Sequence, residues 1–171
     1  MPTYSDDLIK SVLRSTKVIA MVGASGNEMR PSYFAMMYLL AKGYIIHPVN
    51  PGLAGKEILG QRVSASLKDV PAPVDMVDIF RASDAAPGIV KEALEEKERL
   101  GLKTIWMQLG VINEEAAEMA RAAGMTVIMD RCPKIEYGRF SGEIGWMGVS
   151  RKVIDNRKPL LFSKGGSLKR A

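Results

Sequence analysis

Short apolar runs alternate with amphipathic stretches along most of the chain. An apolar run of roughly 4–8 residues bounded by turn residues is typical of a buried parallel strand, and apolar residues spaced three to four apart are typical of a helix. The first pattern predicts strands over residues 18–22, 44–49, 74–80, 104–107 and 126–129. The second predicts helices over residues 6–15, 31–41, 84–100 and 113–123, with a short extended piece at 61–63 and a turn of helix at 66–69.

Strands that alternate with helices in this way indicate right-handed βαβ units and a parallel sheet covered on both faces. We therefore expect an α/β fold: a Rossmann-like, doubly wound parallel sheet of about five strands in a single three-layer domain. The 171 residues are enough for one domain with a full core. In such a sheet a ligand lies beyond the carboxyl ends of the strands, so the residues that follow each strand are the candidate site.

The first expected strand runs directly into a loop of small residues, which are Gly23, Ala24, Ser25, Gly26 and Asn27. A helix is expected to begin at Pro31, so the loop is a strand-to-helix turn. Such a turn directs backbone N–H groups and the positive end of a helix dipole at one point. The sequence therefore predicts a ligand that carries a phosphate group.

The usual dinucleotide signals are incomplete. The loop has Gly23-x-x-Gly26 in place of the full G-x-G-x-x-G pattern. The second strand ends in Val49, Asn50 and Pro51, which offer no acid for the ribose hydroxyls of NAD and no base for the extra phosphate of NADP. The phosphate-binding motif of nucleotide hydrolases is absent from the sequence. An NAD(P)-binding regulator remains an alternative interpretation.

Basic residues are concentrated at the end of the chain. Residues 1–133 carry 15 lysines and arginines against 16 acidic residues, whereas residues 134–171 carry 9 against 3, so the net charge of +5 belongs to the C-terminal part. We expect a ligand-binding domain over residues 1–137 and a basic, solvated extension over residues 138–171. No nucleic-acid-binding motif accompanies the charge, so no nucleic-acid partner is expected.

Other features of the sequence narrow down the class of protein. No apolar run approaches the roughly 20 residues that a membrane helix needs, and the acidic N-terminus is unlike a secretory signal, so we expect a cytoplasmic protein without a membrane partner. A single cysteine, Cys132, and a single histidine, His47, exclude an internal disulfide framework and supply too few ligands for zinc. Self-association into a homo-oligomer stays open.

A set of short segments is informative because the segments follow one another in a particular order and at particular spacings along the chain. The segments are Val22-Gly23-Ala24-Ser25, Arg30-Pro31-Ser32-Tyr33, Gly43-Tyr44, Pro48-Val49-Asn50-Pro51, Ile58-Leu59-Gly60, Ser66-Leu67, Val77-Asp78-Ile79-Phe80-Arg81, Trp106-Met107-Gln108-Leu109-Gly110 and Asp130-Arg131-Cys132-Pro133. With them, residues 17–134 resemble the small single-domain CoA-binding proteins. These proteins are relatives of the CoA-binding domains in the α subunit of succinyl-CoA synthetase and in NDP-forming acyl-CoA synthetases.

The resemblance implies a nucleotide-type site for coenzyme A or an acyl-CoA. It implies that the pyrophosphate lies on the glycine loop, the adenosine on the segment after the second strand, and the rest of CoA near the later strand ends. The residues implied are Gly23, Ala24, Ser25, Gly26, Asn27, Arg30, Ser32, Val49, Asn50, Pro51, Phe80, Arg81, Gln108, Gly110 and Cys132. The synthetases carry a lysine where this chain has Leu53 or Ala54, so Lys56 or Arg81 would meet the 3′-phosphate.

The resemblance implies no catalysis, because the synthetases transfer phosphate with a histidine in a second domain. His47 lies within an expected strand and is interpreted as structural. The expected function is therefore a non-catalytic binding or regulatory role. An enzyme acting on a nucleotide-linked substrate, with Asp130, Arg131 and Cys132 as its reactive groups, is the alternative.

Cys132 follows the last expected strand, on the ligand side of the sheet. Arg131 and Lys134 are close in sequence, and nearby cations lower the pKa of a thiol. We hypothesise that Cys132 forms a mixed disulfide with the CoA thiol. A small buried side chain without such a role is the alternative interpretation.

Overall fold

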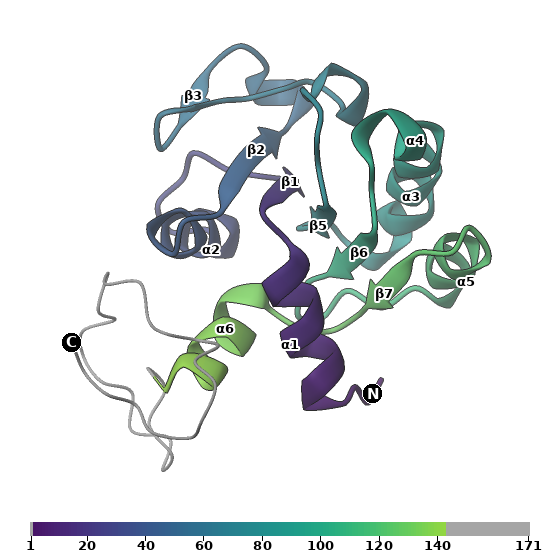
Figure 1. Ribbon diagram of the computed structural model, residues 1–171. Coiled ribbons are helices and arrows are strands. Elements are labelled where there is room, and N and C mark those ends of the chain that lie inside the picture. Colours follow the sequence, from purple (N-terminus) through teal and green to yellow (C-terminus); the bar gives the residue numbers. More distant parts are fainter. Residues whose placement is uncertain (1, 143–171) are drawn as a thin grey trace.

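The computed structural model describes residues 2–142 of the chain. A five-stranded, all-parallel sheet lies at its centre, with the strand order β2-β1-β5-β6-β7 (Figure 1). The strands are β1 (Val18–Val22), β2 (Ile45–Val49), β5 (Met76–Ile79), β6 (Thr104–Met107) and β7 (Thr126–Ile128). The strand order reverses at β1, as in a doubly wound sheet. The predicted α/β fold class is confirmed, and each predicted strand is present.

Helices cover both faces of this sheet. They are α1 (Asp6–Ser15), α2 (Pro31–Ala41), α3 (Ala86–Glu95), α4 (Lys97–Leu100), α5 (Glu114–Ala122) and α6 (Pro133–Ser141). Figure 1 shows α3 and α5 on one side of the sheet and α1, α2 and α6 on the other. Two separate apolar clusters correspond to these two sides. The result is the three-layer arrangement expected from alternating strands and helices.

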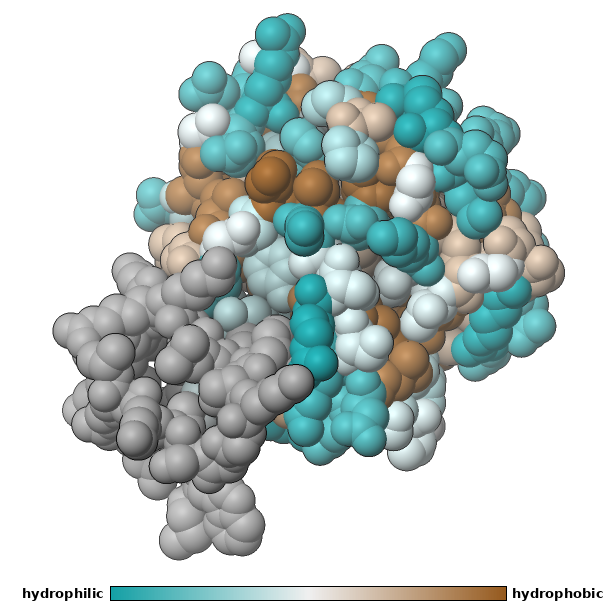
Figure 2. Space-filling model, in the orientation of Figure 1, coloured by the Kyte–Doolittle hydropathy of each residue, from teal (hydrophilic) through white to brown (hydrophobic). Residues whose placement is uncertain are grey.

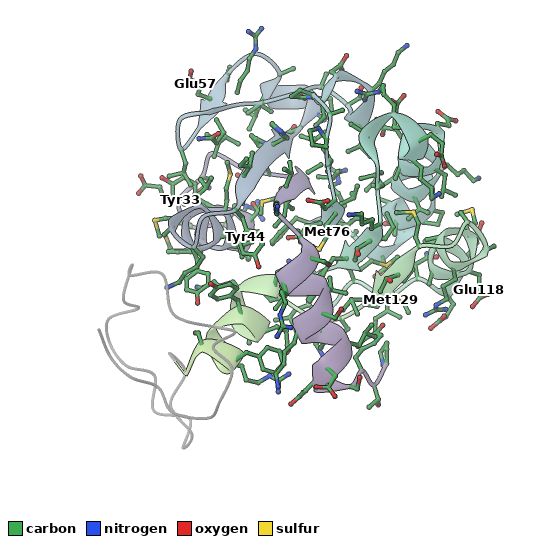
Figure 3. All side chains as sticks on the ribbon, in the orientation of Figure 1. Tyr33, Tyr44, Glu57, Met76, Glu118 and Met129 are labelled. Atoms are coloured by element: carbon green, nitrogen blue, oxygen red, sulfur yellow. The ribbon has the colours of Figure 1, made fainter. Side chains whose placement is uncertain are left out.

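The strands form where they do because the core takes side chains from both of their faces. All four residues of β5 and of β6 are buried. Met76 of β5 and Tyr44, just before β2, both lie in the layer under α1, where the Tyr44 hydroxyl donates to the Leu13 carbonyl at 2.8 Å (Figure 3). One of the buried residues of β5 is not apolar: Asp78 carries a carboxyl group and is 0% exposed in this central strand.

The predicted helix over residues 84–100 is divided in the structure. A single turn of 3-10 helix at Ser83–Ala85 leads into α3, and Glu96 separates α3 from α4. The Glu96 carboxylate accepts from the Arg99 guanidinium, which also donates to the carbonyls of Leu67 and Val70. These contacts hold the last turn against the loop before β5, which explains the break.

The predicted extended piece at 61–63 is one half of a small hairpin. Strands β3 (Glu57–Ile58) and β4 (Gln61–Arg62) pair antiparallel, and both residues of the turn, Leu59 and Gly60, have positive φ. Ile58 is buried against the apolar cluster under α2. The hairpin therefore covers the side of the glycine loop.

Helix α6 was not predicted from the sequence. It begins at Pro133, a residue favoured at the first helical position, and ends at Gly142, whose φ of +74° closes the helix. The expected boundary between residues 137 and 138 falls inside this helix. The remainder of the basic extension, residues 143–171, lies outside the described residues.

No helix among residues 2–142 is both long and apolar enough to cross a membrane. On the face drawn in Figure 2, apolar patches lie between hydrophilic side chains.

Candidate functional site

The glycine loop begins with a position that only glycine fills without strain. Gly23 has a φ of +88°, and a Cβ placed on it would lie 2.4 Å from the carbonyl oxygen of Phe80. Its amide donates to the Val49 carbonyl at 2.9 Å. The loop is thus pressed onto the ends of both β2 and β5, the strands that flank β1.

Side chains of the loop cap several of its own amides. Ser32 Oγ accepts from the Ser25 amide at 3.2 Å, and Ser25 Oγ accepts from the Asn27 amide at 3.1 Å. The amides of Ala24 and Gly26 have no acceptor among the described residues. The loop is therefore held in shape from within, and the amide of the exposed residue Gly26 stays available near the start of α2.

Asn50 has a use that the sequence did not reveal. Its Nδ2 donates to the Ala24 carbonyl at 2.9 Å, and its Oδ1 accepts from the Gly52 amide at 2.9 Å. Both ends of the amide are therefore engaged within the protein. An amide can donate to a carbonyl and accept from an N–H at once, whereas an ionised acid can only accept. This explains why the position carries asparagine rather than the acid of a nicotinamide site.

A cavity of about 680 Å³ lies where α2 and α6 begin, beyond the ends of β5 and β6. Pro31 and Ala35 of α2 form one wall, and Lys134 and Ile135 of α6 form another. Volumes of roughly 300–1,000 Å³ are typical of pockets that hold small molecules.

Four of the residues predicted from the sequence also line this cavity, namely Phe80, Arg81, Gln108 and Cys132. The cavity adjoins the glycine loop in two ways: Gly23 lies against Phe80 and Arg81, and Pro31 begins the helix that follows the loop. The other predicted residues do not line it. Arg30 is exposed at the N-terminus of α2, where its side chain makes no capping bond.

The walls of the cavity combine apolar surface with positive charge. Among the described residues that line it, the charged side chains are Arg81 and Lys134, and the remainder are mostly apolar. The Lys134 ammonium lies 5.8 Å from the ring of Phe34, an exposed residue of α2. This surface suits a ligand that has both an uncharged arm and an anionic group.

Gln108 and Asp78 form a buried pair at the cavity. Gln108 Nε2 donates to both carboxylate oxygens of Asp78, at 2.9 and 3.1 Å. Burial raises the pKa of Asp78 to about 7, against the effect of the Gln108 hydrogen bond, which favours the ionised form. The sequence motif contained Asp78, but a single polar residue in an apolar run gave no sign of its partner.

Cys132 lines the cavity and is 9% exposed. Burial raises the pKa of its thiol; backbone amides and Lys134 oppose this, and the Asp78 carboxylate adds to it. The sequence-based expectation of a lowered pKa is therefore wrong, because loss of hydration outweighs the nearby cation. Arg131 does not contribute, since its side chain points elsewhere.

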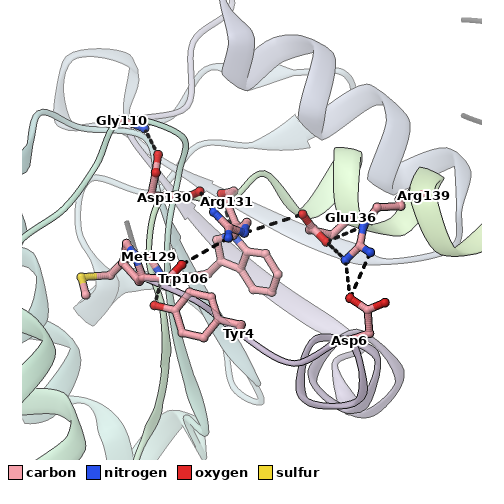
Figure 4. Close-up of polar contacts among 10 residues, drawn as sticks. Tyr4, Asp6, Trp106, Gly110, Met129, Asp130, Arg131, Glu136 and Arg139 are labelled. Atoms are coloured by element: carbon pink, nitrogen blue, oxygen red, sulfur yellow. Dashed lines mark hydrogen bonds and ion pairs between the residues drawn. The ribbon is translucent and has the colours of Figure 1, made fainter. Parts of the chain in front are cut away.

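Asp130 and Arg131 serve to fix the end of the sheet, as Figure 4 shows. Asp130 adopts a φ of +55° and accepts from the Gly110 amide at 2.8 Å. Arg131 donates to the carbonyls of Asp130 and Pro2, and its own carbonyl accepts from Trp106 Nε1 at 2.8 Å. Neither residue lines the cavity. Of the three residues of the alternative enzyme interpretation, only Cys132 therefore lines the cavity.

His47 lies within β2, half-buried, and burial lowers its pKa. It does not line the cavity. Within residues 2–142, no three histidine, cysteine or acidic side chains gather in a way that would hold a metal ion.

Comparison with known proteins gives a consistent set of relatives. Residues 17–138 match the family described as the CoA binding domain. The uncharacterized protein YneT of Bacillus subtilis (strain 168) is 40% identical over 129 residues, which are 75% of this chain and 91% of YneT. A hypothetical protein from Pyrococcus horikoshii OT3 is 34% identical, with a TM-score of 0.74 over 80% of this chain and 92% of that chain.

A larger protein is similar over part of its length. The dinucleotide-forming acetyl-coenzyme A synthetase 1 of Ca. Korarchaeum cryptofilum is 25% identical to this chain, with a TM-score of 0.54. The similarity covers 65% of this chain and 25% of the synthetase. The range matched by the family, residues 17–138, includes the glycine loop and every residue named above as lining the cavity.

Proposed function

The chain belongs to the family of CoA-binding domains, and from this premise we propose that it binds coenzyme A or an acyl-CoA without converting it. The observation that carries the proposal is that two features lie next to each other. A loop with an available amide, that of Gly26, at a helix N-terminus adjoins a cavity whose walls are apolar and positively charged. CoA has the matching parts in the same order: a pyrophosphate, and next to it a long uncharged arm.

In this arrangement the pyrophosphate lies on the amide of Gly26 and on the N-terminus of α2. Arg30 is exposed beside them and contributes a guanidinium, which binds phosphate oxygens in pairs. The pantetheine arm enters the cavity between α2 and α6. Any acyl group is then held at its far end, near Gln108 and Cys132.

The adenosine lies along Val49, Asn50 and Pro51, with the 3′-phosphate near Arg81 or Lys56. Arg81 is favoured because it lies close to the glycine loop: its Cδ would lie 2.9 Å from a Cβ on Gly23. Lys56 is exposed in the segment before the hairpin.

The proposal of binding without turnover is supported by the groups that reach the cavity. They include an amide that already donates to Asp78, a thiol with a raised pKa and two cations. This set is suited to holding an uncharged thioester arm close to anionic phosphate groups. The natural role in this proposal is that of a carrier or sensor of CoA in the cytoplasm.

Thermal unfolding in the presence of CoA, acetyl-CoA, NAD and NADP tests the proposal. A ligand at 100 times its dissociation constant stabilises the folded state by about 2.7 kcal/mol, which is a readily measured shift. We expect a shift with CoA and acetyl-CoA alone. Arg30→Ala should weaken CoA binding about tenfold through loss of a charge-assisted contact, whereas Arg121→Ala, on α5 at the opposite face of the sheet, serves as the control. Stabilisation by NAD or NADP alone would overturn the proposal.

A further inference from the structure

Asp78 is a buried carboxyl group with one side-chain hydrogen-bond partner among the described residues. It is 0% exposed in the middle of the central strand β5, and the hydrogen bonds to its carboxylate come from Gln108 Nε2, which contacts both oxygens. An ionised carboxylate can only accept hydrogen bonds. The two ends of the Gln108 amide are therefore not interchangeable: the NH₂ group must face Asp78.

The other end of the amide consequently faces away from Asp78. Gln108 is 5% exposed and lines the cavity, and its Oε1 has no donor among the described residues. No buried side-chain nitrogen or oxygen within residues 2–142 lacks a hydrogen-bond partner. The small exposed area of Oε1 therefore faces the cavity. An acceptor that is almost completely buried thus opens into a space with mostly apolar walls.

We propose that Asp78 is a positioning residue, which fixes the Gln108 amide so that its carbonyl oxygen accepts a hydrogen bond from an amide N–H of the ligand. The inference rests on the proposed function, since the pantetheine arm of CoA carries amide N–H groups. The cations that line the cavity, Arg81 and Lys134, are donors only, so they cannot take this part. The Asp78–Gln108 pair then selects ligands with an amide-containing arm.

The charge of Asp78 sets the conditions for the test. Burial raises the pKa of Asp78 to about 7. The Asp78 carboxylate in turn raises the pKa of the neighbouring Cys132 thiol. A protonated Asp78 would be able to donate to Gln108 Oε1 and turn the amide round. Binding is therefore best measured at pH 8, where the carboxylate is ionised.

Asp78→Asn is the first variant. It keeps the shape of the side chain but offers both a donor and an acceptor, so the orientation of the Gln108 amide is no longer imposed. We expect CoA to bind about fivefold more weakly by calorimetry. Adenosine 3′,5′-bisphosphate, which lacks the pantetheine arm, should bind with unchanged affinity. A merely structural carboxylate would affect both ligands alike.

Asp75→Asn is the matched control. Asp75 precedes β5, and its carboxylate accepts from the amides of Lys17 and Val18 at 2.9 and 3.0 Å, at the opposite end of the sheet from the cavity. We expect this substitution to change stability and leave both affinities unchanged.

Gln108→Met provides a second, independent arm. It removes the carbonyl, so CoA affinity should fall by a similar factor, and adding Asp78→Asn to it should cause no further loss, because Asp78 acts through Gln108. Additive losses, or equal losses for CoA and the bisphosphate in Asp78→Asn, would overturn the role of Asp78. Failure of the wild-type protein to bind CoA would instead overturn the proposed function.

Discussion

Gly23 is the residue at which backbone conformation and site geometry depend on each other most closely. Its φ of +88° is unfavourable for any other residue, and a Cβ would meet the Phe80 carbonyl at 2.4 Å. We predict that Gly23→Ala lowers the free energy of unfolding by about 2 kcal/mol or more, as strain and backbone displacement add. Urea denaturation measures this. Gly26→Ala is the control, since a Cβ there has only ordinary contact with Ile58 at 3.9 Å; equal losses in the two variants would contradict this explanation.

The raised pKa of Asp78 predicts how the stability of the protein changes with pH. Its pKa is about 7 in the folded protein, against 3.8 for an unperturbed aspartate, so the folded state binds the proton more tightly. Stability therefore falls as pH rises between these values. Relative to Asp78→Asn, the free energy of unfolding of the wild-type protein should fall by about 1.4 kcal/mol per pH unit from about pH 4 to 7 and should not fall further above pH 7. Comparing the two proteins cancels the contribution of His47. A difference that does not vary with pH would refute the assignment.

Cys132 predicts slow thiol chemistry at neutral pH. Because its pKa is raised, little thiolate is present at pH 7, and exchange with the disulfide of oxidised CoA should accelerate with pH, by about tenfold per unit. Exchange would release one CoA thiol and leave CoA joined to Cys132. Mass spectrometry follows the adduct over time, with Cys132→Ser as the control. Absence of any CoA-sized adduct would end the mixed-disulfide hypothesis.

At the scale of elements, most of the sheet and its helices could be predicted from the chain. The bounds of α1 coincide with the predicted 6–15, because Ser5 supplies the cap, accepting from the Leu8 amide, and acidic residues occupy the first turn. The parallel strands are recognisable because both of their faces are buried and their residues are almost all apolar.

Helix α6 escaped prediction because its burial does not follow an apolar pattern. Its buried positions include Glu136, Gly138 and Ser141. Glu136 accepts from Arg139 of the same helix, and Arg139 in turn binds Asp6 of α1. Long-range packing of this kind leaves no periodic signal in the sequence.

The candidate site likewise contains residues that could be predicted from the sequence and residues that could not. Residues at strand ends, such as Phe80 and Gln108, could be anticipated because parallel strands end at one edge. The contribution of Lys134 and Ile135 could not, since it depends on α6 folding back beside α2. The uses of Asn50 and Asp78 depend on the Ala24 carbonyl and the Gln108 side chain, which lie 26 and 30 residues away along the chain.

Tyr137 is the residue through which α6 packs most directly against its neighbours. Its ring meets those of Tyr38 and Tyr44 edge-on, with centroids 6.0 and 5.9 Å apart. We predict that Tyr137→Ala lowers the free energy of unfolding by about 3 kcal/mol, through lost apolar burial and aromatic contact. Ile135→Ala on the exposed side of α6 should have little effect on stability. Similar losses in both variants, measured by urea denaturation, would show that α6 is not anchored through Tyr137.

At the scale of the whole molecule, the sheet separates one apolar layer from a layer that also holds the cavity. One apolar cluster lies between the sheet and α3 and α5. On the other side, the beginnings of α2 and α6 diverge around the cavity, and the glycine loop leads into it. The sequence resemblance to CoA-binding domains is confirmed by the family match over residues 17–138. The fold thus leaves one edge of one layer open, where the family and the geometry point to the same ligand.

A crystal structure of the protein with CoA is the measurement that tests the proposed binding mode most directly. We predict the pyrophosphate on the amide of Gly26 at the N-terminus of α2, and the pantetheine arm between α2 and α6. We also expect an arm N–H within hydrogen-bond distance of Gln108 Oε1. CoA bound on the face covered by α3 and α5, or with its arm outside the cavity, would contradict the central claim.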